Sequence, residues 1–432
     1  MYTDPLMKIV NQYVEDYKND LIQLASDLVK IPSENILPDG FEKEAQDYLC
    51  GYLKKLDDIE LDYFTPFEVK GIENHPAYRH GRNYINRPNI VAVKKGNKSS
   101  RSLIFSSHID TVTRKPLPWN LAEPFSGKII EGKLFGRGSF DMKGALASTV
   151  MVLKIIADNK IILKGDLIVE SVVDEENAGS NGTLASRLKG YNGDVAILPE
   201  PSLLDICPAC KGGKAYRISL KGKAGTGYGG ELISNPVYGI SLLAYNIYNY
   251  EKKINQNPYL ESFYYKEEKN PRTVILDKVQ AGDLEPGGNI GIPDEAWFSI
   301  FINTLPGFSE EMLDNEFKKF IIDIVKKNKD VFSREPEITG ITRYLWPFEV
   351  NKDNPATRDL FFASNALGLK NPLVTGAKFA CDGFIFNNYF SIPTIIFGPR
   401  GGNAHAQDEY VLIDDLILLT KIFLYFTLKW CN

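Results

Sequence analysis

The sequence predicts an α/β fold in which a three-layer α/β/α domain carries a smaller inserted domain of ferredoxin-like order, β-α-β-β-α-β. Three observations support this prediction. The chain has 432 residues, which is too long for one ordinary hydrophobic core. Helical and extended patterns alternate near both ends of the chain, as in proteins built around a largely parallel sheet. Between about residues 212 and 342 the order of the elements changes.

The first segment, residues 1–211, alternates long helices with short apolar strands. Helices are expected where apolar residues recur at helical spacing, at 6–31, 41–56 and 141–159. Strands are expected over the short apolar runs 89–95, 102–110, 166–173 and 194–200. The polar stretch 64–90 is the part of the chain most expected to be flexible.

The middle segment, residues 212–342, has the β-α-β-β-α-β order of a compact unit of its own. The expected elements, in chain order, are strand 214–224, helix 236–253, strands 272–282 and 295–307, helix 309–328 and strand 335–341. The last segment, 343–432, has the same alternation of helices and strands as the first segment, with a strand at 393–399 and a final helix. We therefore expect the first domain to be built from 1–211 and 343–432, with 212–342 inserted.

Composition excludes several classes of function. The chain is 44% hydrophobic with a net charge of −5 and has no block of lysines and arginines, so neither nucleic acid nor an anionic membrane is an expected partner. The N-terminus has no apolar core of a signal peptide, and the apolar final helix is too short and too charged to span a bilayer. Five cysteines, an odd number, indicate a reducing cytoplasm, and Cys207 and Cys210 are expected to be ordinary structural cysteines.

Candidate chemical residues follow several of the expected strands. His108 ends one strand, and Asp110, two residues later, faces the same way and can orient the imidazole. Asp141 precedes a helix, and His405 follows the strand at 393–399. Taken singly, His108 could be a packed histidine and Asp141 a helix N-cap.

Three glutamates complete the set, namely Glu175, Glu176 and Glu200, each after an apolar strand. Ligands of open α/β sheets bind at the carboxyl ends of the strands, so we expect all these groups at one edge. Lys143 and Arg137, the main nearby bases, can both point away. Two histidines with several carboxylates suit zinc, cobalt or manganese, and two such ions bridged by one aspartate need five ligands.

The crowding of acids in "VVDEENAGSNG", residues 172–182, then has an explanation. A pair of divalent cations would compensate Asp174, Glu175 and Glu176. Neighbouring residues on an extended chain point in different directions. One glutamate can therefore bind metal while the other acts as a general base toward the substrate.

These motifs resemble those of the co-catalytic metallohydrolases that include acetylornithine deacetylase, succinyl-diaminopimelate desuccinylase, aminoacylase-1 and glutamate carboxypeptidase. The matching stretches, in order, are "LASDLVKIPSEN", "RPNIVAV", "SSHIDTV", "PFSGKIIEGKLFGRGSFDMKG", "VVDEENAGSNGT", "LPEPS" and "FGPRGGNAHAQDEYV". The resemblance implies a metallopeptidase-type catalytic domain, two divalent ions, and hydrolysis of an amide bond in an N-acyl amino acid or small peptide. It also implies that the inserted domain is a lid through which the chain forms a homodimer.

The resemblance assigns a role to each site residue. It implies that His108, Asp141 and Glu200 hold one metal, most simply zinc. Asp141, Glu176 and His405 would hold the other, so that Asp141 bridges. Glu175 matches the general base, and Asp110 matches the acid that orients His108. A cis peptide is expected after the bridging aspartate, at Asp141–Met142.

Three departures from the family pattern concern substrate contacts. Thr226 stands where the lid carries an oxyanion-stabilising histidine, and a hydroxyl offers only a neutral hydrogen bond. Phe301 and Asn303 replace an aspartate and an arginine of the lid. "ACDGFIFN" keeps Asp382 but lacks the arginine that often holds a substrate carboxylate. Candidate substrate contacts are therefore Thr226 and the residues Asn289, Arg400 and Lys378.

Two hypotheses of function follow. The first is a dinuclear metal-dependent amidohydrolase or peptidase in which metal-activated water gives its proton to Glu175. The second is a metal-binding module of the same fold that has lost hydrolysis. The lost lid residues favour the second hypothesis, whereas the retained Glu175 favours the first, because a protein that only binds has no need of a base.

Overall fold

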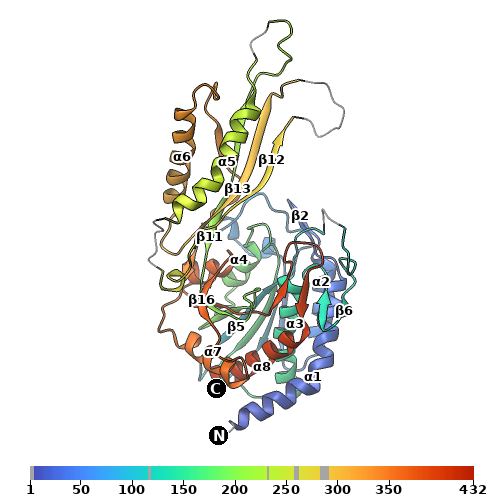
Figure 1. Cartoon of the computed structure of the whole chain (residues 1–432). Helices are drawn as coiled ribbons and strands as arrows, with labels where there is room; N and C mark the ends of the chain where they lie inside the picture. Colours follow the sequence, from blue (N-terminus) through green and yellow to red (C-terminus); the bar gives the residue numbers. More distant parts are fainter. Residues whose placement is uncertain (1–3, 115–117, 231–232, 257–261, 283–290) are drawn as a thin grey trace. The chain divides into compact units, whose positions relative to one another are not determined.

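The computed structural model describes residues 4–114, 118–230, 233–256, 262–282 and 291–432 (Figure 1). These residues form two compact units. Unit 1 comprises 1–209, 349–377 and 381–432, and unit 2 comprises 210–348 and 378–380. Among the described residues, no helix is long and apolar enough to cross a membrane.

The main sheet of unit 1 has nine strands. In spatial order they are β15 (Phe348–Glu349), β10 (Ile206–Cys210), β17 (Thr394–Ile396), β9 (Ala196–Leu198), β5 (Leu103–His108), β8 (Leu167–Val172), β4 (Asn89–Lys94) and β3 (Glu60–Phe64), with β16 (Val374–Ala377) beside β10. The sheet is mixed rather than largely parallel. Its centre, β17-β9-β5-β8, is parallel, whereas β10 runs antiparallel to β17, β4 to β8 and β3 to β4. The four central strands therefore end at one edge, where the predicted site residues follow them.

Helices cover both faces of this sheet and make the three layers. Five helices contribute side chains to one hydrophobic core, namely α1 (Pro5–Lys30), α2 (Lys43–Leu53), α3 (Gly144–Asp158), α7 (Pro355–Ala366) and α8 (Ile413–Trp430). All five are labelled in Figure 1. On β8, Val169 belongs to this core, whereas the next residue, Glu170, pairs with Arg187 of α4 (Asn181–Leu188). Because successive strand residues face opposite sides, α4 covers the other face.

Two smaller sheets hold the loops of unit 1. One has the order β18 (Gly401–Gly402), β19 (Tyr410–Leu412), β7 (Lys133–Phe135) and β6 (Lys128–Ile130). Because β7 leads into the loop before Asp141, and β18 and β19 flank His405, this sheet brings the two loops together. The other is the pair β1 (Asn35–Ile36) and β2 (Asp39–Gly40).

The polar segment 64–90 is an ordered part of unit 1, not the flexible segment that we expected. It contains the short helices η1 (Pro66–Glu68) and η2 (Ile72–Asn74), and it buries Ile72, Tyr84 and Arg87. Its charged residues were a misleading sign of exposure, because Arg87 is neutralised inside the protein by Glu42.

Unit 2 has the β-α-β-β-α-β order expected of the insert. Its main elements are β11 (Gly212–Lys221), α5 (Pro236–Ile254), β12 (Val274–Ala281), β13 (Glu295–Thr304), α6 (Glu310–Lys327) and β14 (Glu337–Gly340), with the short helix η4 (Phe263–Tyr265) after α5. The strand order is β12-β13-β11-β14, and all neighbours are antiparallel. Side chains of α5 and α6 pack with Ile218 and Phe298 of the sheet into a core of their own.

Candidate active site

Asp141 lies at the centre of a cluster of histidines and carboxylates. Its Oδ1 is 3.2 Å from Nε2 of His108, and its Oδ2 is 3.3 Å from Nε2 of His405. Glu200 Oε2 lies 3.7 Å from Nε2 of His108, and Glu176 Oε2 lies 2.9 Å from Nε2 of His405. The five groups therefore form two sets, each with one histidine, one glutamate and one oxygen of Asp141.

Three of these groups meet the spacing required for a shared cation, because ligand atoms of His108, Asp141 and Glu176 all lie within 4.8 Å of one another.

Asp141 reaches this position from the π-helical turn η3 (Ser139–Lys143), whose φ and ψ values at Asp141 and Met142 are not helical. The Asp141–Met142 peptide is cis, as the resemblance implied.

The tautomer of His108 is fixed by the backbone. Its Nδ1–H donates to the main-chain carbonyl of Asp110 at 2.9 Å, which leaves Nε2 as the atom that faces Asp141 and Glu200. The carboxylate of Asp110 is farther away, 3.8 Å from Nδ1. Asp110 thus holds the imidazole chiefly through its carbonyl, not through the carboxylate as the H-x-D spacing suggested.

The carboxylate of Asp110 instead binds the backbone of the loop that carries Glu175 and Glu176. Its Oδ1 accepts the backbone N–H of Glu175 at 3.2 Å, and its Oδ2 accepts that of Glu176 at 3.1 Å. Glu176 is fixed further by Val112, whose N–H donates to Oε1 at 3.2 Å. Asp110 therefore connects the histidine strand to both glutamates.

Mutual charge perturbs every member of the cluster. Burial lowers the pKa of His108, but the charge of Glu200 and the hydrogen bond to Asp141 outweigh it and raise that pKa well above its usual value. The charge of Glu176 raises the pKa of His405 to about 11. Burial raises the pKa of Glu200 to about 7 and that of Glu175 well above its usual range, although His108 opposes both changes. Positive charge at this site therefore favours the ionised carboxylates.

Asp174 is compensated differently from its two neighbours. Its carboxylate is fully buried and turned away from the cluster, toward the 64–90 segment. Tyr84 Oη donates to Oδ2 at 2.5 Å, while Arg87 Nη2 and Arg82 Nε lie 3.5 and 3.8 Å from Oδ1. The expectation that metal ions compensate all three acids of this stretch was therefore wrong for Asp174, which has two arginines.

Glu409, which the sequence reasoning missed, holds the loop that precedes Asp141. Its Oε1 accepts the N–H groups of Phe140 and Asp141 at 3.0 and 3.1 Å. Its Oε2 accepts the N–H of Gly138 at 3.1 Å and pairs with Arg137 at 2.6 Å. Its position four residues after His405 was the only signal in the sequence, since the partners lie far away along the chain.

The basic side chains near the cluster bind partners outside it. Arg137 is occupied by Glu409, and Lys143 donates to the carbonyls of Leu28 and Ile31 at 3.1 and 2.7 Å. Arg400, an expected substrate contact, donates from Nε and Nη2 to Asp415 at 2.7 and 2.6 Å. This bidentate pair engages the guanidinium, although the side chain is 52% exposed, and the role of Arg400 as a substrate clamp stays a prediction.

Two further predicted substrate contacts, Thr226 and Asn289, belong to the part of the chain expected to form the lid. Thr226 is exposed in unit 2, and its hydroxyl accepts the N–H of Tyr228 at 3.4 Å. Asn289 lies outside the described residues. Asp382 is buried in unit 1, where it accepts the hydroxyl of Thr183 at 2.6 Å, and burial raises its pKa to about 6.

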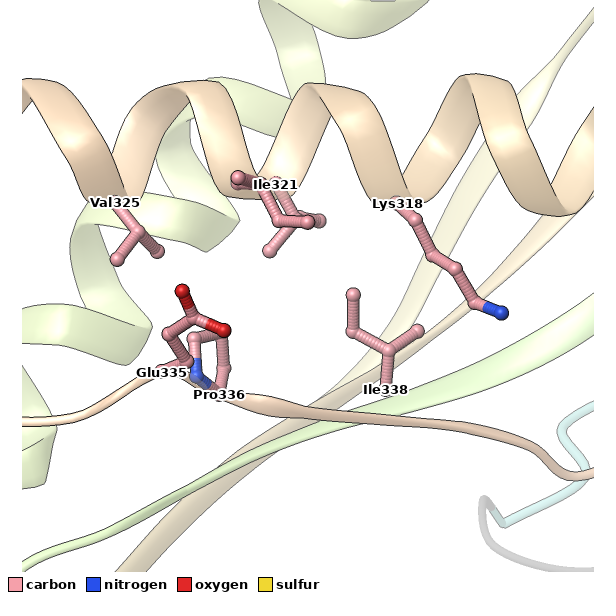
Figure 2. A pocket seen from close by; sticks show the side chains of 7 residues that line it. Lys318, Ile321, Val325, Glu335, Pro336 and Ile338 are labelled. Carbon is pink, nitrogen blue, oxygen red and sulfur yellow. The ribbon is translucent and has the colours of Figure 1, made fainter.

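A separate cavity of about 220 Å³ lies in unit 2 between α6 and the start of β14 (Figure 2). Its walls are mainly aliphatic, and Lys318 and Glu335 are its charged lining residues. One carboxylate among apolar side chains cannot provide the donor set of the Asp141 cluster.

Comparison with known proteins identifies the family of the chain. The model of peptidase family M20/M25/M40 matches residues 104–429. The chain is 25% identical to N-formyl-4-amino-5-aminomethyl-2-methylpyrimidine deformylase of Bacillus subtilis, over 97% of this chain and 96% of that protein. It is also 25% identical to a probable succinyl-diaminopimelate desuccinylase of Staphylococcus aureus, over 96% and 98%.

Among solved structures, human carnosine dipeptidase 1 superposes with a TM-score of 0.77 and 16% identity, covering 99% of both chains. This likeness shows a common fold that extends over both units. The chain therefore belongs to peptidase family M20/M25/M40 and is a metal-dependent hydrolase of amide bonds.

Proposed function

We propose that the protein hydrolyses the amide bond of an N-acyl amino acid or small peptide, with Glu175 as general base. The observation that carries this proposal is the arrangement around Asp141, whose two oxygens face two different histidines at 3.2 and 3.3 Å. The names of the relatives, a deformylase and a desuccinylase, support a small acyl group on an amine.

The donor set fits two divalent cations. His108, Asp141 and Glu200 would hold one, and Asp141, Glu176 and His405 the other, with zinc as the first choice and cobalt or manganese as alternatives. Such ions supply a Lewis acid for the carbonyl and make water a stronger acid at neutral pH. Their charge would also stabilise Glu176 and Glu200 as carboxylates, although burial raises the pKa of both.

Glu175 is then the group that moves the proton. Its backbone is fixed by Asp110. Burial raises the pKa of its carboxyl well above the usual range, and the charges of Glu200, Asp382 and Glu176 raise it further, against the effect of His108. A carboxylate of raised pKa accepts a proton from the attacking water readily and can return it to the leaving amine.

The chain carries no histidine in unit 2, since its four histidines are all in unit 1. We propose that unit 2 is the lid and that Thr226 or Asn289 takes over contact with the substrate. A neutral hydroxyl or amide would stabilise a developing oxyanion less than an imidazolium does, so slow turnover is expected.

We also propose that the protein is a homodimer formed through unit 2. β12 is an edge strand of the described sheet, and its exposed residues include Ile275 and Val279, which are 55% and 53% exposed. The neighbouring α5 carries an exposed stripe of tyrosines, Tyr238, Tyr245 and Tyr248. An apolar edge strand of this kind is a template for a second copy. Ile275→Lys combined with Val279→Glu should give a monomer in analytical ultracentrifugation, and an unchanged mass would contradict this interface.

The experiment that tests the reaction is an activity screen. N-formyl, N-acetyl and N-succinyl amino acids and dipeptides are incubated with the protein and zinc, cobalt or manganese, in parallel with Glu175→Ala. We expect release of a free amine from at least one substrate by the wild type only. Equal release of amine by the two proteins from every substrate would contradict the role of Glu175 as general base.

A further inference from the structure

Asn35 lies behind the loop of Glu175 and Glu176, in a position fixed by the backbone. Its N–H donates to the carbonyl of Thr111 at 2.9 Å, and the N–H of Thr111 donates to the carbonyl of Ser33 at 3.0 Å. Only 2% of Asn35 is exposed. This part of the chain therefore runs alongside the end of β5, directly after His108 and Asp110.

The side-chain amide of Asn35 joins two buried carboxylates. Its Nδ2 donates to Oδ2 of Asp110 at 2.9 Å and lies 3.3 Å from Oδ1 of Asp174. Both carboxylates are fully buried, so a donor between them offsets a repulsion that solvent does not screen.

These two carboxylates determine the path of the catalytic loop. Asp110 accepts the N–H groups of Glu175 and Glu176, and Asp174 is the residue at which the loop begins. The loop is held once more from the same side, because Nδ2 of Asn177 donates to the carbonyl of Asn35 at 3.0 Å. Movement of either carboxylate would therefore move the backbone that carries the general base.

We propose that Asn35 is a positioning residue for Glu175, acting through Asp110 and Asp174. The inference rests on the proposed role of Glu175 as general base. Without the amide, the buried carboxylate of Asp110 loses its side-chain donor, whereas Asp174 keeps Tyr84, Arg82 and Arg87. Asp110 then turns away from one or both backbone N–H groups. The base then loses its fixed distance to the reacting water, although no group that touches the substrate has changed.

The test compares Asn35→Ala and Asn35→Ser with Gln46→Ala, all as metal-loaded proteins. Gln46 is a matched control because it is a fully buried amide in unit 1 with two hydrogen bonds of 2.9 Å to Ser171. Two quantities are measured, namely kcat and KM on the substrate found in the screen, and hydrogen exchange at the amides of Glu175 and Glu176.

We expect Asn35→Ala to lower kcat by about 10- to 100-fold, as loss of an outer partner of a metal site does, with little change of KM. Both amides should exchange faster than in Gln46→Ala, even if the two variants lose equal thermal stability. Asn35→Ser keeps one hydroxyl donor and should lie between the wild type and Asn35→Ala, and it serves as the test if the alanine variant does not fold.

Equal kcat in Asn35→Ala and Gln46→Ala would overturn the inference, and so would unchanged exchange at both amides. A parallel Glu175→Gln variant separates this failure from failure of the proposed function. If Glu175→Gln is inactive while Asn35→Ala matches its control, only the role of Asn35 is wrong. If Glu175→Gln keeps full activity, the proposed base is wrong as well.

Discussion

Replacing Arg87 with methionine removes the cation that neutralises two buried carboxylates. Arg87 is 1% exposed, and its Nε and Nη2 donate to Glu42, the shortest of these bonds being 2.6 Å. Its Nη2 also lies 3.5 Å from Asp174. Methionine fills much of the same volume, so the loss should come from charge rather than from a cavity.

The expected loss is about 3–5 kcal/mol of unfolding free energy near pH 8, the usual cost of removing one partner of a buried ion pair. It should depend on pH. Burial already raises the pKa of Glu42 to about 7, in spite of Arg87, against 4.5 for the free side chain. Without Arg87 this pKa rises further, so the folded variant binds more protons than the unfolded chain from pH 4.5 to 7 and beyond. Its stability therefore falls as pH rises, and the difference from wild type is larger at pH 8 than at pH 5.

Urea denaturation of the wild type, Arg87→Met and Glu42→Gln/Arg87→Met at pH 5 and pH 8 measures this difference. The double variant removes the charge of Glu42 as well, so it should recover part of the loss at pH 8. A deficit that is equal at both pH values, with no recovery in the double variant, would refute the electrostatic reasoning.

Three further outcomes are expected. Glu409→Gln should lower metal affinity about 10- to 100-fold, because an amide cannot accept from donors at both of its ends, and metal retained after dialysis measures this. Arg400→Ala should lower the melting temperature, through loss of its pair with Asp415, without changing KM for substrates that carry a carboxylate; a selective rise of KM would support Arg400 as a substrate clamp. Removal of metal by a chelator should abolish activity and lower the melting temperature, and added zinc or cobalt should restore both, since an ion that binds only the folded state stabilises it.

Local sequence patterns predicted the helices and strands better than they predicted how the strands pair in the sheet. The helix of 141–159 and the strand of 102–110 are periodic enough to be recognised from the sequence alone. The apolar run at 89–95 gave no sign of strand direction, and β4 in fact runs antiparallel to β8. A buried strand looks apolar whichever way its neighbour runs, so periodicity could not distinguish the mixed sheet from a parallel one.

In the candidate site, too, some residues could be recognised from the sequence and others could not. His108, Asp141 and His405 could be found because each lies at or after the end of a strand or a glycine-rich turn. The residues that hold them could not be found in this way. Asn35 precedes its partner Asp174 by 139 residues, and Arg137 precedes Glu409 by 272. Such contacts depend on the completed fold, and a buried arginine or asparagine carries no local sign of its partner.

The most direct test of the account is the ratio of kcat for the wild type to kcat for Glu175→Gln, with both proteins loaded with zinc. Glu175 is outside the set of groups that would hold the ions, so the variant should bind the same amount of metal. If Glu175 is the general base, kcat falls by about 10²- to 10⁴-fold. A variant that keeps two zinc ions and the full kcat would contradict the central claim.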